Sequence, residues 1–111
     1  MFEKNLNIAY LLDFYGDLLS ERKRSVMNMY YNEDLSLAEV ASEVGISRQG
    51  VRDLIKKSEE ELFEYEEKLG LAKKISSLEE SVQRLRSIAS EHSLPEALQN
   101  EIDVISDIID S

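Results

Sequence analysis

Apolar residues recur at helical spacing along most of the chain, and the pattern is sharpest in the middle. There, Ser36 is followed by Glu39 in a capping box, which predicts the start of a short helix with an apolar face. Gly45 lies where a left-handed turn residue is needed, and Ser47 can cap the helix that follows. Together these signals predict a helix, a tight turn and a second helix over residues 36–58, which is a helix-turn-helix.

The same periodicity predicts helices on either side of this motif. An apolar stretch near the N-terminus predicts a first helix over about residues 4–18, and Ser20 can cap a second helix that begins E-R-K-R. The second helix of the helix-turn-helix continues to about Leu69, where Gly70 either ends it or merely weakens it. We expect residues 1–69 to form one helical domain.

Beyond this domain the apolar pattern becomes a heptad. Apolar residues alternate at spacings of four and three in two stretches, 71–89 and 98–109. Between them, Ser93 and Glu96 have the spacing of another capping box, and the proline between these two residues fits a first helical turn. Two such helices joined by a short turn predict an acidic αα-hairpin over residues 70–111.

A two-helix hairpin buries little apolar surface by itself, and each of its helices keeps an apolar edge. We therefore expect the hairpin to dock on the first domain, on another protein or on a second copy of the chain, and we favour the second copy, as a homodimer. The residues expected at this contact lie on the two heptad seams: Ile75, Leu78, Val82, Leu85, Ile102, Ile105 and Ile109.

Composition agrees with an all-α fold, a helix-turn-helix domain followed by a hairpin. Four glycines and one proline among 111 residues are too few turn residues for a fold of many strands. The chain has no cysteine, no apolar run of the roughly 20 residues that a membrane span needs, and no basic segment leading into an apolar run at its N-terminus. These features indicate a cytoplasmic protein without a membrane span.

The net charge of −10 is unevenly distributed. Residues 1–58 contain eight Lys and Arg against nine Asp and Glu, whereas residues 59–111 contain five against fourteen. Nearly all the excess negative charge therefore lies in the second half, so the first half can still present a local basic surface to a polyanion.

Such a surface is predicted on the second helix of the helix-turn-helix. Arg48, Arg52 and Lys56 follow one another at steps of four and form a stripe along one side. Arg and the neighbouring Gln49 can bind guanine and adenine edges in a major groove, while Lys56 and Lys57 suit phosphates. We interpret these five residues as a nucleic-acid-binding surface, with RNA as an alternative polyanion to DNA.

A second basic group, Arg22, Lys23 and Arg24, opens the preceding helix and could hold a phosphate of the same nucleic acid. The alternative for all these cations is that they only pair with nearby carboxylates on solvated faces. The carboxylates considered for such pairs are Glu39, Glu43, Asp53 and Glu59.

The remaining polar groups do not indicate catalysis. The acidic run 59–67 is interpreted as a solvated helix face, or as a docking surface for a basic protein, rather than as a metal site, because hard metals need oxygens converging from several elements. His92 is the only histidine, lies in a turn and is expected on the surface. No phosphate-binding glycine loop or nucleophile with a base is present, so we expect no enzyme activity, metal or cofactor.

Two resemblances follow from these motifs. The segment E-R-K-R-S-V-M-N-M-Y-Y-N-E-D-L-S-L-A-E-V-A-S-E-V-G-I-S-R-Q-G-V-R-D-L-I-K-K resembles region 4 of bacterial sigma-70-type factors, which reads the −35 promoter element. Over residues 5–110, the opening Y-L-L-D-F-Y-G-D-L-L and the later E-E-L-F-E-Y-E-E-K-L-G-L are similar to the YlxM family. Members of that family are small bacterial proteins whose genes lie beside those of the signal recognition particle (SRP) GTPase and its receptor.

The resemblance implies a DNA-binding regulatory protein that takes part in the SRP pathway. The alternative is an adaptor that binds SRP RNA or the SRP GTPase through the acidic half, without sequence-specific DNA binding. Gly50 departs from the sigma-like motif, which has a better helix former there, and predicts a softer start to the second helix.

Overall fold

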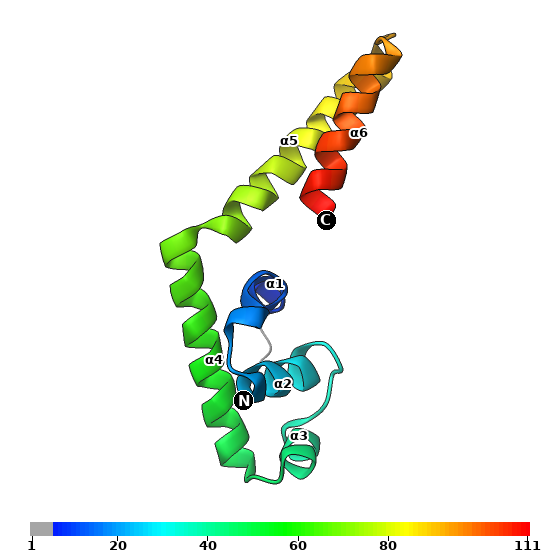
Figure 1. Ribbon diagram of the computed structural model, residues 1–111. Coiled ribbons are helices and arrows are strands. Elements are labelled where there is room, and N and C mark those ends of the chain that lie inside the picture. The colour runs from blue at the N-terminus through cyan, green and yellow to red at the C-terminus, as the bar shows by residue number, and fades with distance from the viewer. Residues whose placement is uncertain (1–5) are drawn as a thin grey trace. The chain divides into compact units, whose positions relative to one another are not determined.

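The structure is a computed structural model, and it describes residues 6–111. These residues form six α-helices and one short 3-10 helix, so the predicted all-α fold is confirmed (Figure 1). None of these helices combines the length and apolar character needed to cross a membrane. In chain order the elements are α1 (Leu6–Tyr15), η1 (Gly16–Leu18), α2 (Glu21–Tyr31), α3 (Leu37–Val44), α4 (Arg48–Leu69), α5 (Leu71–Glu91) and α6 (Glu96–Asp110).

The first helix is shorter than the apolar pattern predicts. Its α-helical part ends at Tyr15, and the chain tightens into η1 through the buried Gly16 before turning at Leu19. Positions 4 and 5 of the predicted helix lie outside the described residues. An added Cβ at Gly16 would lie 3.3 Å from the Leu12 side chain, so close packing at this turn favours glycine.

The chain divides into two compact units, of which the first ends at Gly70. In the first unit, α1, α2 and α3 all pack against the long helix α4 and lie along the same side of it (Figure 1). The centre of this unit is a set of almost fully buried side chains: Ile8, Tyr15, Val26, Met27, Val40, Val51, Ile55 and Leu62. This packing holds α4 in a fixed place relative to the three shorter helices.

The helix starts predicted at Ser20 and Ser36 are confirmed. The Ser20 hydroxyl accepts a hydrogen bond from the backbone of Lys23 at 3.3 Å. At α3 the capping box is complete, because Ser36 Oγ accepts from the Glu39 backbone at 3.1 Å and Glu39 Oε1 accepts from the Ser36 backbone at 3.0 Å. These bonds, first the one from the Ser36 backbone, lower the pKa of the Glu39 carboxyl below its ordinary value.

The second unit, Leu71–Ser111, is the predicted αα-hairpin of α5 and α6. Its most deeply buried side chains are Ala72, Val82 and Ile102. On the polar side of the hairpin, Arg86 and Asp103 form a 3.0 Å ion pair between the two helices.

The predicted capping box at the start of α6 is wrong. The N-cap is Pro95, no side chain caps this end, and Ser93 lies two residues before it in the exposed connection. Pro95 is also not in the first turn, because its ψ of 145° is extended and the helix begins only at Glu96. The capping-box spacing is measured from the N-cap, and the proline moves the N-cap to a position whose residue has no side-chain acceptor.

Candidate nucleic-acid interface

The turn between α3 and α4 has the geometry that the sequence predicts. Gly45 has a φ of 78°, and its backbone N–H donates to the carbonyl of Ala41 at 2.9 Å. Ile46 donates to the same carbonyl at 3.2 Å, and Ser47 Oγ caps α4 by accepting from the backbone of Gly50 at 3.0 Å. The start of α4 is therefore held by local hydrogen bonds and by the buried side chain of Val51.

Gly50 has a structural reason within this cap. A Cβ added there would lie 3.2 Å from Ser47 Oγ and 3.4 Å from Ile46 Cδ1. The distance to Ser47 Oγ is tighter than most real Cβ contacts, and the distance to Ile46 Cδ1 is that of close van der Waals contact. The glycine that weakens the helix by propensity therefore leaves room for the capping hydroxyl and the corner side chain.

Four cations on the first half of α4 face solvent. Arg48, Arg52, Lys56 and Lys57 are all exposed, and none has a carboxylate within 4.0 Å among the residues that the structure describes. The pairing with Asp53 considered from the sequence is made instead by Gln49, whose Nε2 lies 3.1 Å from Asp53 Oδ1. The cations are thus open to an external anion, and Gln49 has to leave Asp53 in order to read a base.

The charges of α4 oppose its own dipole. Arg48 is the first residue of the helix, whose first turn has no acidic residue, while Glu66 and Glu67 lie in the last turn beside Lys68. A helix N-terminus favours anions and a C-terminus favours cations, each by about 0.3–1 kcal/mol. The arrangement therefore does not serve the stability of the helix, and an anionic partner at the N-terminus would remove the conflict at Arg48.

The second basic group is divided by the fold. Arg22 is exposed and has no ion-pair partner in the described part of the chain. Lys23 Nζ lies 3.4 Å from Glu61 Oε2 of α4, and Arg24 Nη1 lies 3.2 Å from Asp17 Oδ1. Of the three residues, only Arg22 can meet a phosphate without giving up a carboxylate.

The structure also shows hydrogen bonds to glutamates of α4 that the sequence did not predict. The Tyr15 hydroxyl donates to Glu66 Oε1 at 2.6 Å, and the Tyr31 hydroxyl donates to Glu59. With Lys23 and Glu61, these bonds tie α1 and α2 to the acidic half of α4. The only sequence signal for them is the presence of tyrosines on the helices that pack there, and spacing alone does not pair them.

The other carboxylates of this acidic run point outward. Glu60 and Glu67 are exposed, and within the described residues neither has an ion pair. Glu64 is 2.9 Å from Lys68 one turn later, and the hydrogen bond between them lowers the pKa of the glutamate and raises that of the lysine. The outward carboxylates form a negative surface next to the cations of the same helix.

In the hairpin, the seam residues expected at a contact between copies fall into two groups. Val82 and Ile102 are buried between α5 and α6, and Ile75 and Ile109 are half-buried. The exposed members of the predicted set are Leu78, Leu85 and Ile105. The buried and half-buried seam residues therefore pack α5 against α6, whereas the exposed seam residues face solvent.

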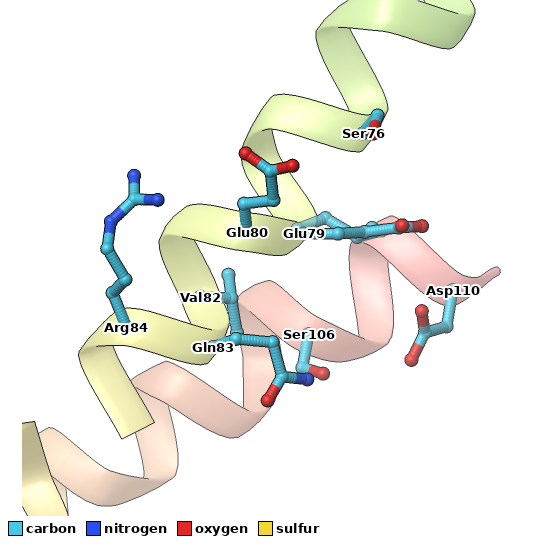
Figure 2. A pocket seen from close by; sticks show the side chains of 9 residues that line it. Ser76, Glu79, Glu80, Val82, Gln83, Arg84, Ser106 and Asp110 are labelled. Carbon is cyan, nitrogen blue, oxygen red and sulfur yellow. The ribbon is translucent and has the colours of Figure 1, made fainter. Parts of the chain in front are cut away.

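The side of the hairpin opposite the exposed seam residues Leu78, Leu85 and Ile105 is polar and contains a groove. Figure 2 shows Glu79 and Gln83 of α5 facing Ser106 and Asp110 of α6 across this groove. Within residues 6–111, no group of three His, Cys, Asp or Glu side chains is placed to hold a metal ion. His92 is exposed in the connection between the helices.

Comparison with known proteins agrees with this geometry. The family model of UPF0122, described as "Putative helix-turn-helix protein, YlxM / p13 like", matches residues 2–104. The chain belongs to the UPF0122 family. Its similar relatives include UPF0122 proteins of Bacillus cereus strain AH187 and Bacillus anthracis strain A0248, each 47% identical over 91 residues, which is 82% of this chain and 83% of the relative. The YlxM-like resemblance of the sequence is thereby confirmed.

Proposed function

We propose that the protein is a non-enzymatic regulator that binds nucleic acid through the first half of α4. The observation that carries this proposal is a set of exposed cations on the first half of α4, Arg48, Arg52, Lys56 and Lys57, none of which has an ion pair among the residues that the structure describes. In a helix-turn-helix, the residues near the start of the second helix are those that enter the major groove. Arg48 and Arg52 then face base edges, and the two lysines face the backbone.

Arg22 extends this surface onto the neighbouring helix α2. It is exposed, it lies in the first turn of α2, and α2 packs against α4. A contact from Arg22 to a phosphate would orient the protein on the duplex without reading sequence. Lys23 and Arg24 contribute only their general positive charge, because carboxylates already occupy them.

The experiment is a binding titration of the full chain with a labelled random duplex and with a structured RNA at several salt concentrations. Between about 50 and 200 mM salt the affinity should fall steeply, and each phosphate-contacting cation removed should lower the salt slope by about one. We expect Arg52→Ala, Lys56→Ala and Lys57→Ala to weaken binding. The matched control is Arg84→Ala, an exposed cation of the hairpin. Absence of binding at low salt, or equal loss in the control, would reject the proposal.

The nucleic acid that the cations of α4 bind most tightly indicates the pathway in which the protein acts. The resemblance of the sequence to the YlxM family implies a role near the SRP, whose RNA is one candidate target and duplex DNA the other. A higher affinity for the SRP RNA than for random duplexes, lost in Arg52→Ala, would place the protein in that pathway. A preference for a selected DNA sequence would instead identify a transcriptional regulator.

A second candidate function uses the outward carboxylates of α4. Glu60, Glu64 and Glu67 remain exposed while other glutamates of the same run are bound internally, so the second half of α4 offers a negative surface to a basic protein such as the SRP GTPase. Reversing the charge at these three residues should abolish capture of the purified GTPase subunit. Capture that is unchanged by the charge reversal would exclude this adaptor role. It would not count against nucleic-acid binding by the cations of α4.

A further inference from the structure

Asp53 is a carboxylate on the half of α4 that carries the exposed cations. Residues of an α-helix advance by about 100° each, which places Asp53 almost directly opposite the buried side chains Val51, Ile55 and Ser58. Asp53 is exposed, and so is Gln49, which lies one turn earlier on the same side. These two residues therefore form the middle of the outward face of this half of the helix, and the cations surround them.

The charges of α4 itself do not account for a carboxylate at this position. Lys56 and Lys57 lie three and four residues after Asp53, which are the spacings at which opposite charges pair on a helix. Within the described part of the chain, neither lysine forms an ion pair with Asp53, which instead accepts a 3.1 Å hydrogen bond from Gln49 Nε2. Asp53 is also the sixth residue of α4, beyond the first turn in which the helix dipole favours an anion.

The chemistry of a major groove leaves one base that suits this carboxylate. Phosphates repel it, and guanine and thymine present only acceptors on their major-groove edges, apart from the thymine methyl group. Adenine presents an amino group with an acceptor nitrogen beside it. Cytosine presents its N4 amino group without a neighbouring acceptor, and an aspartate can accept a hydrogen bond from that group. A carboxylate in the middle of a face that enters the groove therefore favours cytosine over the other three bases.

We propose that Asp53 determines sequence specificity by accepting a hydrogen bond from N4 of a cytosine in the major groove of duplex DNA. This inference rests on the proposed nucleic-acid binding by α4, and it names the class of target. The major groove of double-stranded RNA is too deep and narrow for side chains to read. A face with a base-reading group at its middle and cations around it therefore fits duplex DNA better than double-stranded RNA.

The hydrogen bond between Gln49 and Asp53 makes recognition depend on two bases. In the free protein the two side chains bind each other. When a cytosine amino group replaces the Gln49 amide at Asp53, Gln49 is released and can pair with an adenine. At a sequence that offers no such amino group, Asp53 stays on Gln49 and neither side chain reads a base. The surrounding cations alone then hold the duplex, through its phosphates.

The test is selection of binding sites by the full chain from a pool of random DNA duplexes, followed by titration of a selected duplex. The wild type should select a cytosine at one position, and replacing that base pair should weaken binding roughly 5- to 150-fold. For Asp53→Asn, the selected sites should lose this cytosine and keep the preferences at other positions. The affinity of this variant for random duplexes should rise a few-fold, because a charge that repels the phosphates is removed.

The matched control is Glu60→Gln. Glu60 is exposed, has no ion pair among the described residues, and lies seven residues, or roughly 10 Å, further along the same side of α4. This variant removes the same charge as Asp53→Asn and should keep the cytosine in its selected sites. Circular dichroism checks that both variants are folded. Gln49→Ala is a second variant, which should keep the cytosine and lose the adenine, so the test does not depend on the folding of Asp53→Asn.

The outcomes distinguish a failure of this inference from a failure of the proposed function. A wild type that binds neither DNA nor structured RNA at low salt would reject nucleic-acid binding itself. A wild type that binds duplexes without selecting a cytosine, or that binds the RNA more tightly than its selected duplex, would overturn only the role of Asp53. The same conclusion would follow if Asp53→Asn selected the same sites as the wild type, or if Glu60→Gln lost the cytosine equally.

Discussion

Tyr15 of α1 donates a 2.6 Å hydrogen bond from its hydroxyl to Oε1 of Glu66, which lies 51 residues later near the end of α4. Tyr15 is 1% exposed, so the bond joins a core residue to the helix that carries the cations Arg48, Arg52, Lys56 and Lys57. Together with the bonds from α2 to Glu59 and Glu61, it fixes the position of α4 within its unit.

Replacing Tyr15 by Phe keeps the ring and removes this bond. Because the partner is a carboxylate that is only partly buried, we expect the free energy of unfolding to fall by about 1–2 kcal/mol. The measurement is urea unfolding followed by circular dichroism. The control is Glu60→Gln, an exposed carboxylate of the same helix without an ion pair in the described structure, which should change stability by less than about 0.5 kcal/mol. Equal stability of Tyr15→Phe and the wild type would show that the bond contributes nothing.

A substitution at Gly45 tests the backbone of the turn. Its φ is 78°, and no atom lies within 4 Å of an added Cβ, so the effect of Gly45→Ala is conformational rather than steric. Alanine in the left-handed region costs about 1–2 kcal/mol, and asparagine costs less because it tolerates that region. We therefore expect Gly45→Ala to unfold at lower urea concentration than Gly45→Asn. The reverse order would show that the turn changes conformation in the variant.

Glu39 predicts a pH dependence of α3. The folded pKa of the Glu39 carboxyl lies below the ordinary value of 4.5. The main cause is the hydrogen bond from the Ser36 backbone N–H, and the second is the Ser36 side chain; both favour the charged form. A lowered folded pKa contributes stability above pH 4.5, and this contribution is lost as the pH falls from 4.5 through the folded pKa. Glutamine can make the same hydrogen bond without titrating.

The measurement compares the unfolding free energies of the wild type and Glu39→Gln at pH 7 and at pH values below 4.5. The difference in favour of the wild type should be largest near neutral pH and should diminish on acidification. The comparison at each pH isolates Glu39 because the rest of the sequence is the same in both proteins. A difference that stays constant with pH would mean that Glu39 is not held in its charged form by the cap.

Much of the fold follows from local patterns. Ser20, Ser36 and Ser47 cap helices as their spacing predicts, and Gly45 adopts the left-handed conformation that ends α3. Gly70 does the same at the end of α4, which decides between ending and weakening that helix. The predicted cap at Ser93 is wrong because a proline two residues later takes the N-cap position.

The candidate site was predicted less completely, because charge pairing depends on distant residues. The exposure of Arg48 and Arg52 agrees with their helical spacing. Nothing local indicates that Lys23 reaches Glu61, a residue 38 positions away, or that Arg24 is held by Asp17 across the turn before α2. Such pairs form only after the helices have packed and brought the two side chains within reach.

By itself, the sequence determined the helices and the caps at Ser20, Ser36 and Ser47, because these depend on interactions between residues at most about one turn apart. The short links between the helices then indicated the helix-turn-helix and the hairpin. Tertiary packing alone decided which glutamates of α4 bind tyrosines and lysine, which cations remain free, and which half of each heptad seam is buried. The physical reason is that a side chain's partner and exposure depend on which helix lies against it, and helix periodicity specifies a face without specifying its neighbour.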